Sequence, residues 1–305
     1  MAIASILMRT LINCTLFTLV WFWAASPIAA ADTVLLIKSE GTVFREVVEG
    51  IRDEIDSELT IVDAVVDDQS EPAAIKTLLL QHRPQAVVLI GNKAANQYAV
   101  LQAQDKTLVY PPSIITAALF VDALLPSMQQ TVGIRYEIPA ISTILAMRPV
   151  LKKPINKVGV IYRQWMQPII KENKQFLTNE QVELVEYQVG NKPKNTNIAV
   201  KKGIRYLLKN QVDAVWVIND NLLLNPNTIS RAWKPRLQKA RIPVLVGVES
   251  LIATKLQFGN LATVPDLYSL GTQTGAMVFD LMDNDWQVTA GQVEQPISIK
   301  KSINR

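Results

Sequence analysis

Two hydrophobic patterns alternate along the chain after its first 31 residues. Short continuous runs of Val, Ile and Leu are followed by longer stretches in which apolar residues recur at helical spacing. Continuous runs are typical of parallel strands that are buried on both faces, so the alternation predicts βα units with helices on both sides of a sheet. In the first half, the predicted strands are 33–38, 59–66, 85–91 and 115–121, and the predicted helices are 43–55, 71–81 and 94–104.

The same alternation begins again after a bridging stretch at 131–136 and a predicted helix at 140–151. Two such repeats, in a chain of 305 residues, favour two lobes over one because domains usually contain about 100 to 200 residues. The predicted fold class is therefore α/β, with two Rossmann-like lobes that each contain a parallel sheet. In the second half, the predicted strands are 157–163, 182–189, 212–218 and 242–248, and the predicted helices are 168–177, 198–209 and 227–240.

The connection between the halves contains no stretch rich in Gly, Ser or Pro. We therefore expect ordered, strand-like crossings that form a multi-strand hinge. A predicted helix at 269–282 and an extended tail at 293–300 follow the second half, and we expect them to cross back to the first lobe before the chain returns. The predicted lobes are residues 32–132 plus about 258–284, and residues 133–257 plus about 285–305.

The first 31 residues have the pattern of a targeting segment. Arg9 is their only charged residue, and a mostly apolar run at 11–25 follows it. Ala29 and Ala31 occupy the two small-residue positions that a signal peptidase requires, so we expect cleavage after about Ala31 and a periplasmic location. The apolar run approaches the roughly 20 residues that span a bilayer, so an uncleaved anchor is the alternative.

The composition argues against several kinds of chemistry. Cys14 is the only cysteine, so the chain after residue 31 has no disulfide, thiolate metal site or cysteine nucleophile. His82, the only histidine, ends a predicted helix, where a Ser-His-Asp triad has no support. No glycine-rich dinucleotide motif or phosphate loop follows a predicted strand. We therefore expect no cofactor, no metal site and no enzymatic activity.

Charge gives no indication of a nucleic-acid partner. Lys and Arg total 31 against 27 Asp and Glu, and the basic residues do not form one long run. Lys201, Lys202, Arg205 and Lys209 lie on one predicted helix at spacings that suit a solvated face.

The strand ends supply the candidate binding residues. In an open α/β sheet, ligands bind beyond the carboxyl ends of the strands. The aromatic residues Phe44 and Trp165 could enclose a planar or apolar ligand from opposite sides, although core packing is the alternative for both. Asp220 could instead be a cap or turn residue, and Glu249 could brace a hinge. The polar candidates at these ends are Ser39, Glu40, Asn92, Asp122, Asp220, Asn221 and Glu249.

Several stretches together resemble a known family: the ABC-transporter substrate-binding proteins of the tryptophan/tyrosine type, which have the type I periplasmic binding fold. The resemblance implies that Ser39, Asn92, Asp122, Asp220, Asn221 and Glu249 face or border a cleft between the lobes. Glu40, the segment 105–113 and Lys255 depart from the family pattern. The stretches are SEGTVFREVVEGIRDEI (39–55), VVLIGNKAANQ (87–97), TVGIRYEIPAISTILAMRPVLKKPINKVGVIY (131–162), VDAVWVINDNLLLNPNTI (212–229) and IPVLVGVESLIATKLQFGNLATVPDLYSLGTQTGAMVFDLM (242–282).

The predicted function is capture of a small polar or aromatic metabolite, such as an amino acid, and its delivery to the membrane permease of an ABC importer. Hinge closure around the ligand would produce the form that the permease recognises. The alternative is a periplasmic sensor module of the same fold that signals to a membrane or outer-membrane partner. An α/β enzyme is the third hypothesis, and it would require a clustered acid-base pair in the cleft.

Overall fold

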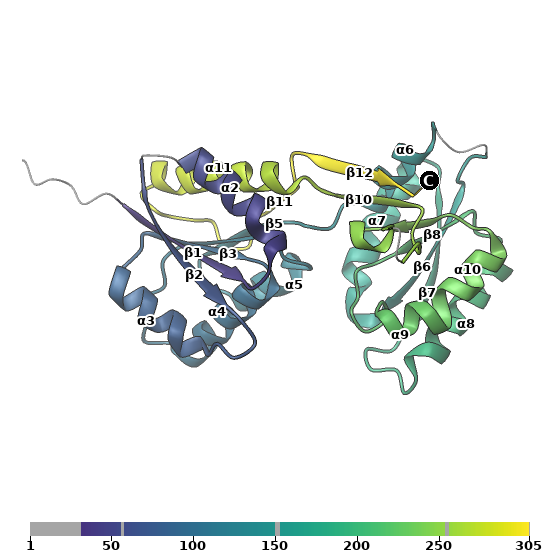
Figure 1. The fold of residues 1–305 in the computed structure, drawn as a ribbon, viewed down its shortest axis with the longest axis horizontal. Coiled ribbons are helices and arrows are strands. Elements are labelled where there is room, and N and C mark those ends of the chain that lie inside the picture. The colour runs from purple at the N-terminus through teal and green to yellow at the C-terminus, as the bar shows by residue number, and fades with distance from the viewer. Residues whose placement is uncertain (1–31, 56–57, 150–152, 254–255, 305) are drawn as a thin grey trace, which may run out of the picture. The chain divides into compact units, whose positions relative to one another are not determined.

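The computed structural model describes residues 32–304 except 56–57, 150–152 and 254–255. The predicted targeting segment and Lys255 lie outside these residues. None of the helices in the described part of the chain combines the length and apolar character needed to span a membrane. The residues from Thr33 onward form one compact unit that contains two six-stranded sheets (Figure 1).

The first sheet has the strand order β11-β5-β4-β3-β1-β2, and all its strands are parallel. Every residue of β3 is buried, which explains why its sequence is a continuous apolar run. The strands are β1 (Thr33–Ser39), β2 (Thr60–Val66), β3 (Ala86–Ile90), β4 (Ser113–Thr116), β5 (Thr131–Ile134) and β11 (Val293–Glu294).

Helices cover both faces of this sheet. On one face, α3 (Pro72–His82), α4 (Asn92–Gln104) and the short α5 (Val121–Leu124) contribute to a single apolar core. On the other face lie α2 (Arg45–Ile55) and α11 (Leu267–Asp283), which are far apart in sequence. These two helices are packed so closely that a Cβ atom on Gly50 would lie 2.2 Å from the carbonyl oxygen of Tyr268. The contact therefore requires glycine.

The second sheet has the order β12-β10-β9-β8-β6-β7. Its strands are parallel except β12, which pairs antiparallel with β10. The strands are β6 (Lys157–Arg163), β7 (Glu183–Val189), β8 (Ala214–Val217), β9 (Val244–Val246), β10 (Leu261–Pro265) and β12 (Ile299–Ile303).

Two apolar cores lie on opposite faces of the second sheet. One includes residues of α6 (Ala140–Met147) and α7 (Gln167–Asn179). The other includes residues of α8 (Thr196–Lys209), of a π-helical turn (Ile229–Trp233) and of α10 (Lys234–Ala240). The short α9 (Pro226–Thr228) precedes the π-helical turn and begins with a capping box formed by Asn225 and Thr228.

The C-terminal region passes between the two lobes, as the sequence predicts, but the strand pairing divides it differently. Strand β10, which the sequence analysis assigns to the first lobe, belongs to the second sheet. Strand β11, assigned to the second lobe, pairs with β5 of the first sheet, and only β12 returns to the second sheet. The expected boundaries near 258 and 285 are therefore wrong for these two short strands.

One predicted strand ends early. The apolar run at 115–121 predicts a strand to residue 121, but β4 ends at Thr116. Ala117 and Phe120 have left-handed backbone conformations, with φ of 52° and 58°, which a strand cannot contain. The segment after Thr116 therefore turns and enters α5 at Val121.

Candidate functional site

Ser39 and Gly91 lie at the carboxyl ends of β1 and β3, where they shape the start of α4. The Ser39 side chain is buried, and its Oγ accepts a hydrogen bond from the backbone amide of Ala94 at 3.1 Å. Gly91 has φ of 85°, and a Cβ atom there would lie 2.6 Å from Phe44 and 2.7 Å from the Ser39 Oγ. Ser39 and Phe44, two of the predicted binding residues, therefore meet at the amino end of α4, where the helix dipole favours negative groups.

Both polar atoms of the Asn92 side chain are hydrogen-bonded within the protein. Its Nδ2 donates to the carbonyl oxygen of Leu119 at 2.7 Å, and its Oδ1 accepts from the Leu119 amide at 2.9 Å. These two bonds attach the first turn of α4 to the loop between β4 and α5. Asn92 therefore positions that loop.

Glu40 is the most accessible of the candidates in the first lobe. It follows β1 directly, and its amide donates to the carbonyl oxygen of Val66 at 2.8 Å. Its side chain is exposed. Its carboxylate is thus presented to solvent at the carboxyl edge of the first sheet.

Asp122 is bound by Arg135, which follows β5. The Arg135 Nε and Nη2 donate to the two carboxylate oxygens of Asp122 at 2.9 and 2.7 Å. Its Nη1 donates to both oxygens of Glu172 on α7, at 2.9 and 3.0 Å. The hydrogen bond to Asp122 raises the pKa of Arg135 above its usual value. Arg135 therefore connects an acid of the first lobe to an acid of the second.

Glu137 lies two residues further along the same crossing and was not predicted as a site residue. Its Oε1 accepts a hydrogen bond from the amide of Phe120 at 3.0 Å. Burial raises the pKa of its carboxyl to about 7, and the hydrogen bond from Phe120 opposes that rise. A carboxyl with such a pKa at a crossing between the lobes changes its charge near neutral pH.

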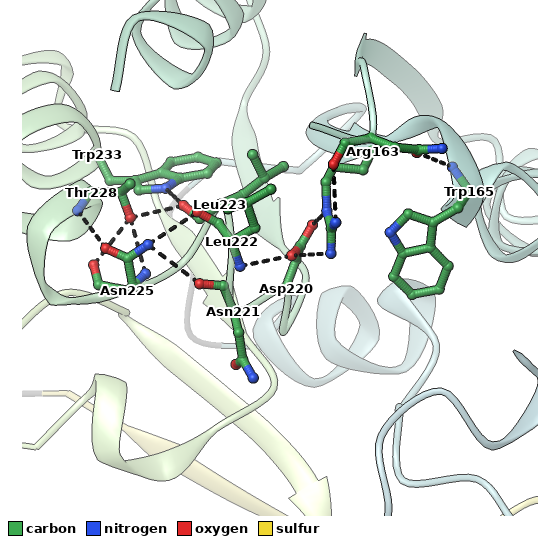
Figure 2. Close-up of polar contacts among 10 residues, drawn as sticks. Arg163, Trp165, Asp220, Asn221, Leu222, Leu223, Asn225, Thr228 and Trp233 are labelled. Carbon is green, nitrogen blue, oxygen red and sulfur yellow. Dashed lines mark hydrogen bonds and ion pairs between the residues drawn. The ribbon is translucent and has the colours of Figure 1, made fainter. Parts of the chain in front are cut away.

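In the second lobe, Asp220 forms a buried ion pair with Arg163, and both lie at strand ends (Figure 2). The Arg163 Nε and Nη2 donate to the two oxygens of Asp220 at 2.6 and 2.8 Å. The amide of Leu222 donates to the same carboxylate at 2.9 Å. Asp220 is therefore both the turn residue that the sequence analysis gives as an alternative and the partner that orients Arg163.

Trp165 lies beside this ion pair. Its backbone amide donates to the Asn191 side chain at 2.9 Å, and the Arg163 guanidinium carbon lies 5.5 Å from the centre of its ring. The ring also meets Phe120 edge to face, with centroids 5.0 Å apart and planes at 84°. Trp165 is thus in contact with Phe120 of the first lobe, whereas Phe44 packs against Gly91 and the first-lobe core.

Asn221 follows Asp220 and is exposed. Its carbonyl oxygen accepts a hydrogen bond from the Nδ2 of Asn225 at 3.3 Å, while its side chain extends away from the Arg163–Asp220 pair (Figure 2). Asn221 is therefore free to contact another molecule, unlike its neighbour.

Glu249 braces the return strand β12. Its carboxylate accepts a hydrogen bond from the Ser302 Oγ and lies 3.3 Å from the Lys300 Nζ. This is the hinge-bracing role that the sequence analysis gives as an alternative. Glu249 also lines a pocket together with Tyr136, whose pKa is raised by burial and by the nearby Glu249 charge.

That pocket receives residues from both lobes and from the crossings. It has a volume of ≈ 410 Å³, within the range of sites for small ligands. A second hollow with contributions from both lobes, beside Arg135 and Glu137, measures only ≈ 30 Å³, about enough for a single water. The larger pocket is lined by Thr42, Val43, Arg45, Glu46, Tyr136, Val248, Glu249, Ser250, Val264, Pro265, Asp266, Leu267 and Lys300.

Other hollows of similar size lie at the opposite ends of the strands. One of ≈ 510 Å³ includes Pro243 and Asn260, which precede β9 and β10, and one of ≈ 470 Å³ includes Pro84 and Pro112, which precede β3 and β4. Binding sites of open α/β sheets lie at the carboxyl ends, so we assign the candidate site to the pocket that contains Glu249. Among the described residues, no group of three or more His, Cys, Asp or Glu could hold a metal ion.

Comparison with known proteins identifies the fold. No family model and no curated protein matches the chain. The ligand-free, open structure of a substrate-binding protein with adhesive properties from Clostridium difficile has a TM-score of 0.63 at 15% identity, covering 90% of this chain and 92% of that one. The structure of an ABC domain in complex with L-Trp from Streptococcus pneumonia has a TM-score of 0.53 at 18% identity, covering 89% and 92%.

A transcriptional activator of the comK gene from Bacillus halodurans is also similar, with a TM-score of 0.52 at 12% identity and coverage of 88% of this chain and 89% of that one. These likenesses show the type I periplasmic-binding-protein-like fold, and the predicted fold class is confirmed. Because the same fold serves solute binding and gene regulation, it does not by itself define a ligand or partner. The tryptophan/tyrosine type stays a prediction.

Three residues of this region are not predicted from the sequence: Arg135 and Arg163, which bind the candidates Asp122 and Asp220, and Glu137, which binds the amide of Phe120. Arg135 and Glu137 lie in or directly after the bridging stretch 131–136, where the hydrophobic pattern indicates only a connection. Arg163 ends the predicted strand 157–163 but is not among the predicted binding residues. One signal was available: an aspartate expected to be buried at the end of an apolar strand requires a cationic partner, and Arg163 ends the neighbouring strand.

Proposed function

We propose that this chain is an exported solute-binding protein that captures a small polar metabolite at the carboxyl ends of its strands and delivers it to the permease of an ABC importer. The pocket of ≈ 410 Å³ carries the proposal, because residues of both lobes and of the crossings contribute to its wall. A ligand that contacts both lobes stabilises the arrangement in which those contacts are all made.

The pocket wall favours a ligand with several hydrogen-bonding groups. Tyr136 and Ser250 supply hydroxyl groups, and Glu46 and Glu249 supply carboxylates. Arg45 and Lys300 supply positive charge, while Val43 and Leu267 supply apolar surface. This mixture suits a zwitterionic molecule such as an amino acid better than a purely apolar one.

Arg163 of the second lobe does not line this pocket, but it is a second group that can bind a carboxylate. Arg163 has five N–H groups, of which two bind Asp220 and one binds the carbonyl oxygen of Asn191. Its side chain is 21% exposed, so its remaining N–H groups can bind an anionic group. Trp165 lies next to Arg163 and adds an apolar surface there.

Binding to the chain after residue 31 tests the proposal. Isothermal titration calorimetry with a panel of amino acids and nucleobases should show saturable binding of at least one compound. Tyr136→Ala should weaken that binding at least tenfold, whereas Tyr206→Ala, a change of the same size on helix α8, should leave it unchanged. Absence of binding across the panel, or equal effects of the two substitutions, would contradict this assignment.

Export and delivery need separate measurements. The mass of the protein recovered from the periplasm should correspond to cleavage after about Ala31. Uptake of the bound compound by cells should fall when the gene is deleted and recover with wild-type protein but not with Tyr136→Ala. Normal uptake in the deletion strain would contradict the transport role and leave the binding result intact.

A further inference from the structure

Two neighbouring helical segments of the second lobe carry many basic residues and no acidic ones. Neither 196–211 nor 226–242 contains Asp or Glu. In the rest of the chain, Asp and Glu outnumber Lys and Arg, because the whole protein has a net charge of only +4. We call the following residues the basic face: Lys201, Lys202, Arg205, Lys209, Arg231, Lys234, Arg236, Lys239 and Arg241.

On α8 the basic residues share one side of the helix. At about 100° per residue, Lys201, Arg205, Lys209 and Lys202 fall within an arc of about 100°. The buried residues of α8 are Val200, Gly203, Ile204 and Leu207, which lie on the opposite side. The basic side of α8 therefore faces outward from the core.

The segment 229–241 extends this surface. Residues of the π-helical turn and of α10 pack into the same core as α8, so both segments cover the same face of the second sheet. Helices α8 and α10 lie side by side in Figure 1. Arg231, Lys239 and Arg241 are exposed. Basic residues about 30 positions apart in sequence thus lie on neighbouring helical segments, although the Nζ of Lys234 is directed to the carbonyl oxygen of Leu256 at 2.8 Å.

The charges of the basic face are not neutralised locally. None of its residues forms an ion pair with another described residue, whereas ten other Lys and Arg side chains do. Unpaired like charges repel one another, and their combined potential attracts anionic surfaces.

Exposed apolar side chains lie among these charges. Ile198 falls in the middle of the basic arc of α8 and is 50% exposed, and Tyr206 at the edge of that arc is 43% exposed. Basic residues combined with aliphatic and aromatic side chains on one helix face suit the headgroup region of an anionic bilayer. A phosphate backbone of nucleic acid would satisfy the charges but would give Ile198 no apolar environment.

We propose that the basic face docks the protein on the surface of a membrane that contains anionic phospholipid. Lys and Arg contact the headgroups, and Ile198 and Tyr206 enter the interface between them. This surface is separate from the proposed ligand pocket, so its test is independent of the proposed function.

Co-sedimentation with lipid vesicles tests the proposal, with the exported protein and its N-terminal sequence determined beforehand. Vesicles of equal parts phosphatidylglycerol and phosphatidylcholine should bind the protein, vesicles of phosphatidylcholine alone should bind it much less, and added salt should weaken binding. Each basic residue near an anionic bilayer contributes roughly fivefold to affinity, so K201Q/K202Q/R205Q should reduce binding at least tenfold.

A second triple variant that removes the same number of positive charges distinguishes an effect of the basic face from an effect of net charge. Lys106, Lys171 and Lys301 are exposed and lie outside the basic face, so K106Q/K171Q/K301Q should bind nearly as well as wild type. Ile198→Ser should weaken binding to the same vesicles without changing its salt dependence. The proposal is overturned if wild type does not bind, if the two triple variants lose binding equally, or if polyglutamate or DNA competes as well as anionic vesicles do.

Discussion

Arg163 binds Asp220 side-on, through hydrogen bonds of 2.6 Å from its Nε and 2.8 Å from its Nη2, and only 2% of the Asp220 side chain is exposed. The two residues are 57 positions apart: Arg163 ends β6, and Asp220 lies shortly after β8 of the same sheet. A carboxylate buried to this degree depends on its cation, because removal of one partner leaves an uncompensated charge. The pair therefore fixes both the loop after β8 and the orientation of the guanidinium beside Trp165.

The first prediction concerns this pair. Arg163→Met should lower the free energy of unfolding by roughly 3–5 kcal/mol, since it leaves Asp220 buried and unpaired. The double variant Arg163→Met/Asp220→Leu should recover a large part of that loss. Urea denaturation measures both. Arg148→Met is the control: its 3.3 Å pair with Glu180 is exposed, so its loss should cost about 1 kcal/mol or less. Equal costs for the two single variants would refute this account.

The second prediction concerns the tight contact at Gly91. Gly91→Ala places a methyl group against Phe44 and Ser39 and forces alanine to adopt φ of 85°. The backbone strain alone costs about 1–3 kcal/mol, and displacement of Phe44 adds to it. Gly190→Ala is the control, because nothing lies within 4 Å of its Cβ position. Thermal unfolding should show a clearly lower Tm for Gly91→Ala alone; a shift shared by both variants would argue against the contact.

The third prediction concerns Asn92, which binds both backbone groups of Leu119. Asn92→Ala should destabilise the protein by roughly 1–3 kcal/mol because two polar backbone groups lose their partner. Asn96→Ala, on the exposed side of the same helix, should change stability by about 0.5 kcal/mol or less. Chemical denaturation distinguishes the two. If Asn92→Ala is as stable as Asn96→Ala, the two bonds to Leu119 do not contribute to stability.

The fold was predictable because its signals are local and repeated. Most predicted strands contain a continuous apolar run, as in β3, and runs of this kind indicate burial on both faces. The edge strands β2 and β7 are exceptions, since Asp63 and Glu186 interrupt their apolar residues. The end of β4 was not predictable from that rule, since the apolar run continues through Ala117 and Phe120, whose left-handed conformations end the strand. Apolar character specifies burial but does not specify the backbone angles.

The candidate site was predictable in position but not in detail. The strand-end rule located Asp220 and Asn92 shortly after the carboxyl ends of β8 and β3, whereas Asp122 lies in α5 because β4 already ends at Thr116. It could not show that all three are already bound within the protein, because their partners Arg163, Arg135 and Leu119 are 57, 13 and 27 residues away. The basic face could not be predicted completely for the same reason. The sequence places Lys201 and Arg205 on one predicted helix, but the packing of α8 against α10, which brings the second group of basic residues near, is visible only in the structure.

The last prediction concerns pH. Burial raises the pKa of Glu137 to about 7 in the folded protein, above the ordinary value of 4.5 that it has when unfolded. Between these values the folded state holds a proton that the unfolded state has lost, so this group makes stability fall as pH rises from about 4.5 to 7 and has no further effect above 7. Glu137→Gln removes that proton equilibrium. The variant should therefore gain stability relative to wild type over this interval, by roughly 1–3 kcal/mol in total. Urea denaturation of both proteins from pH 5 to pH 8 measures the difference, and a difference that does not change with pH would show that Glu137 titrates alike in the folded and unfolded states.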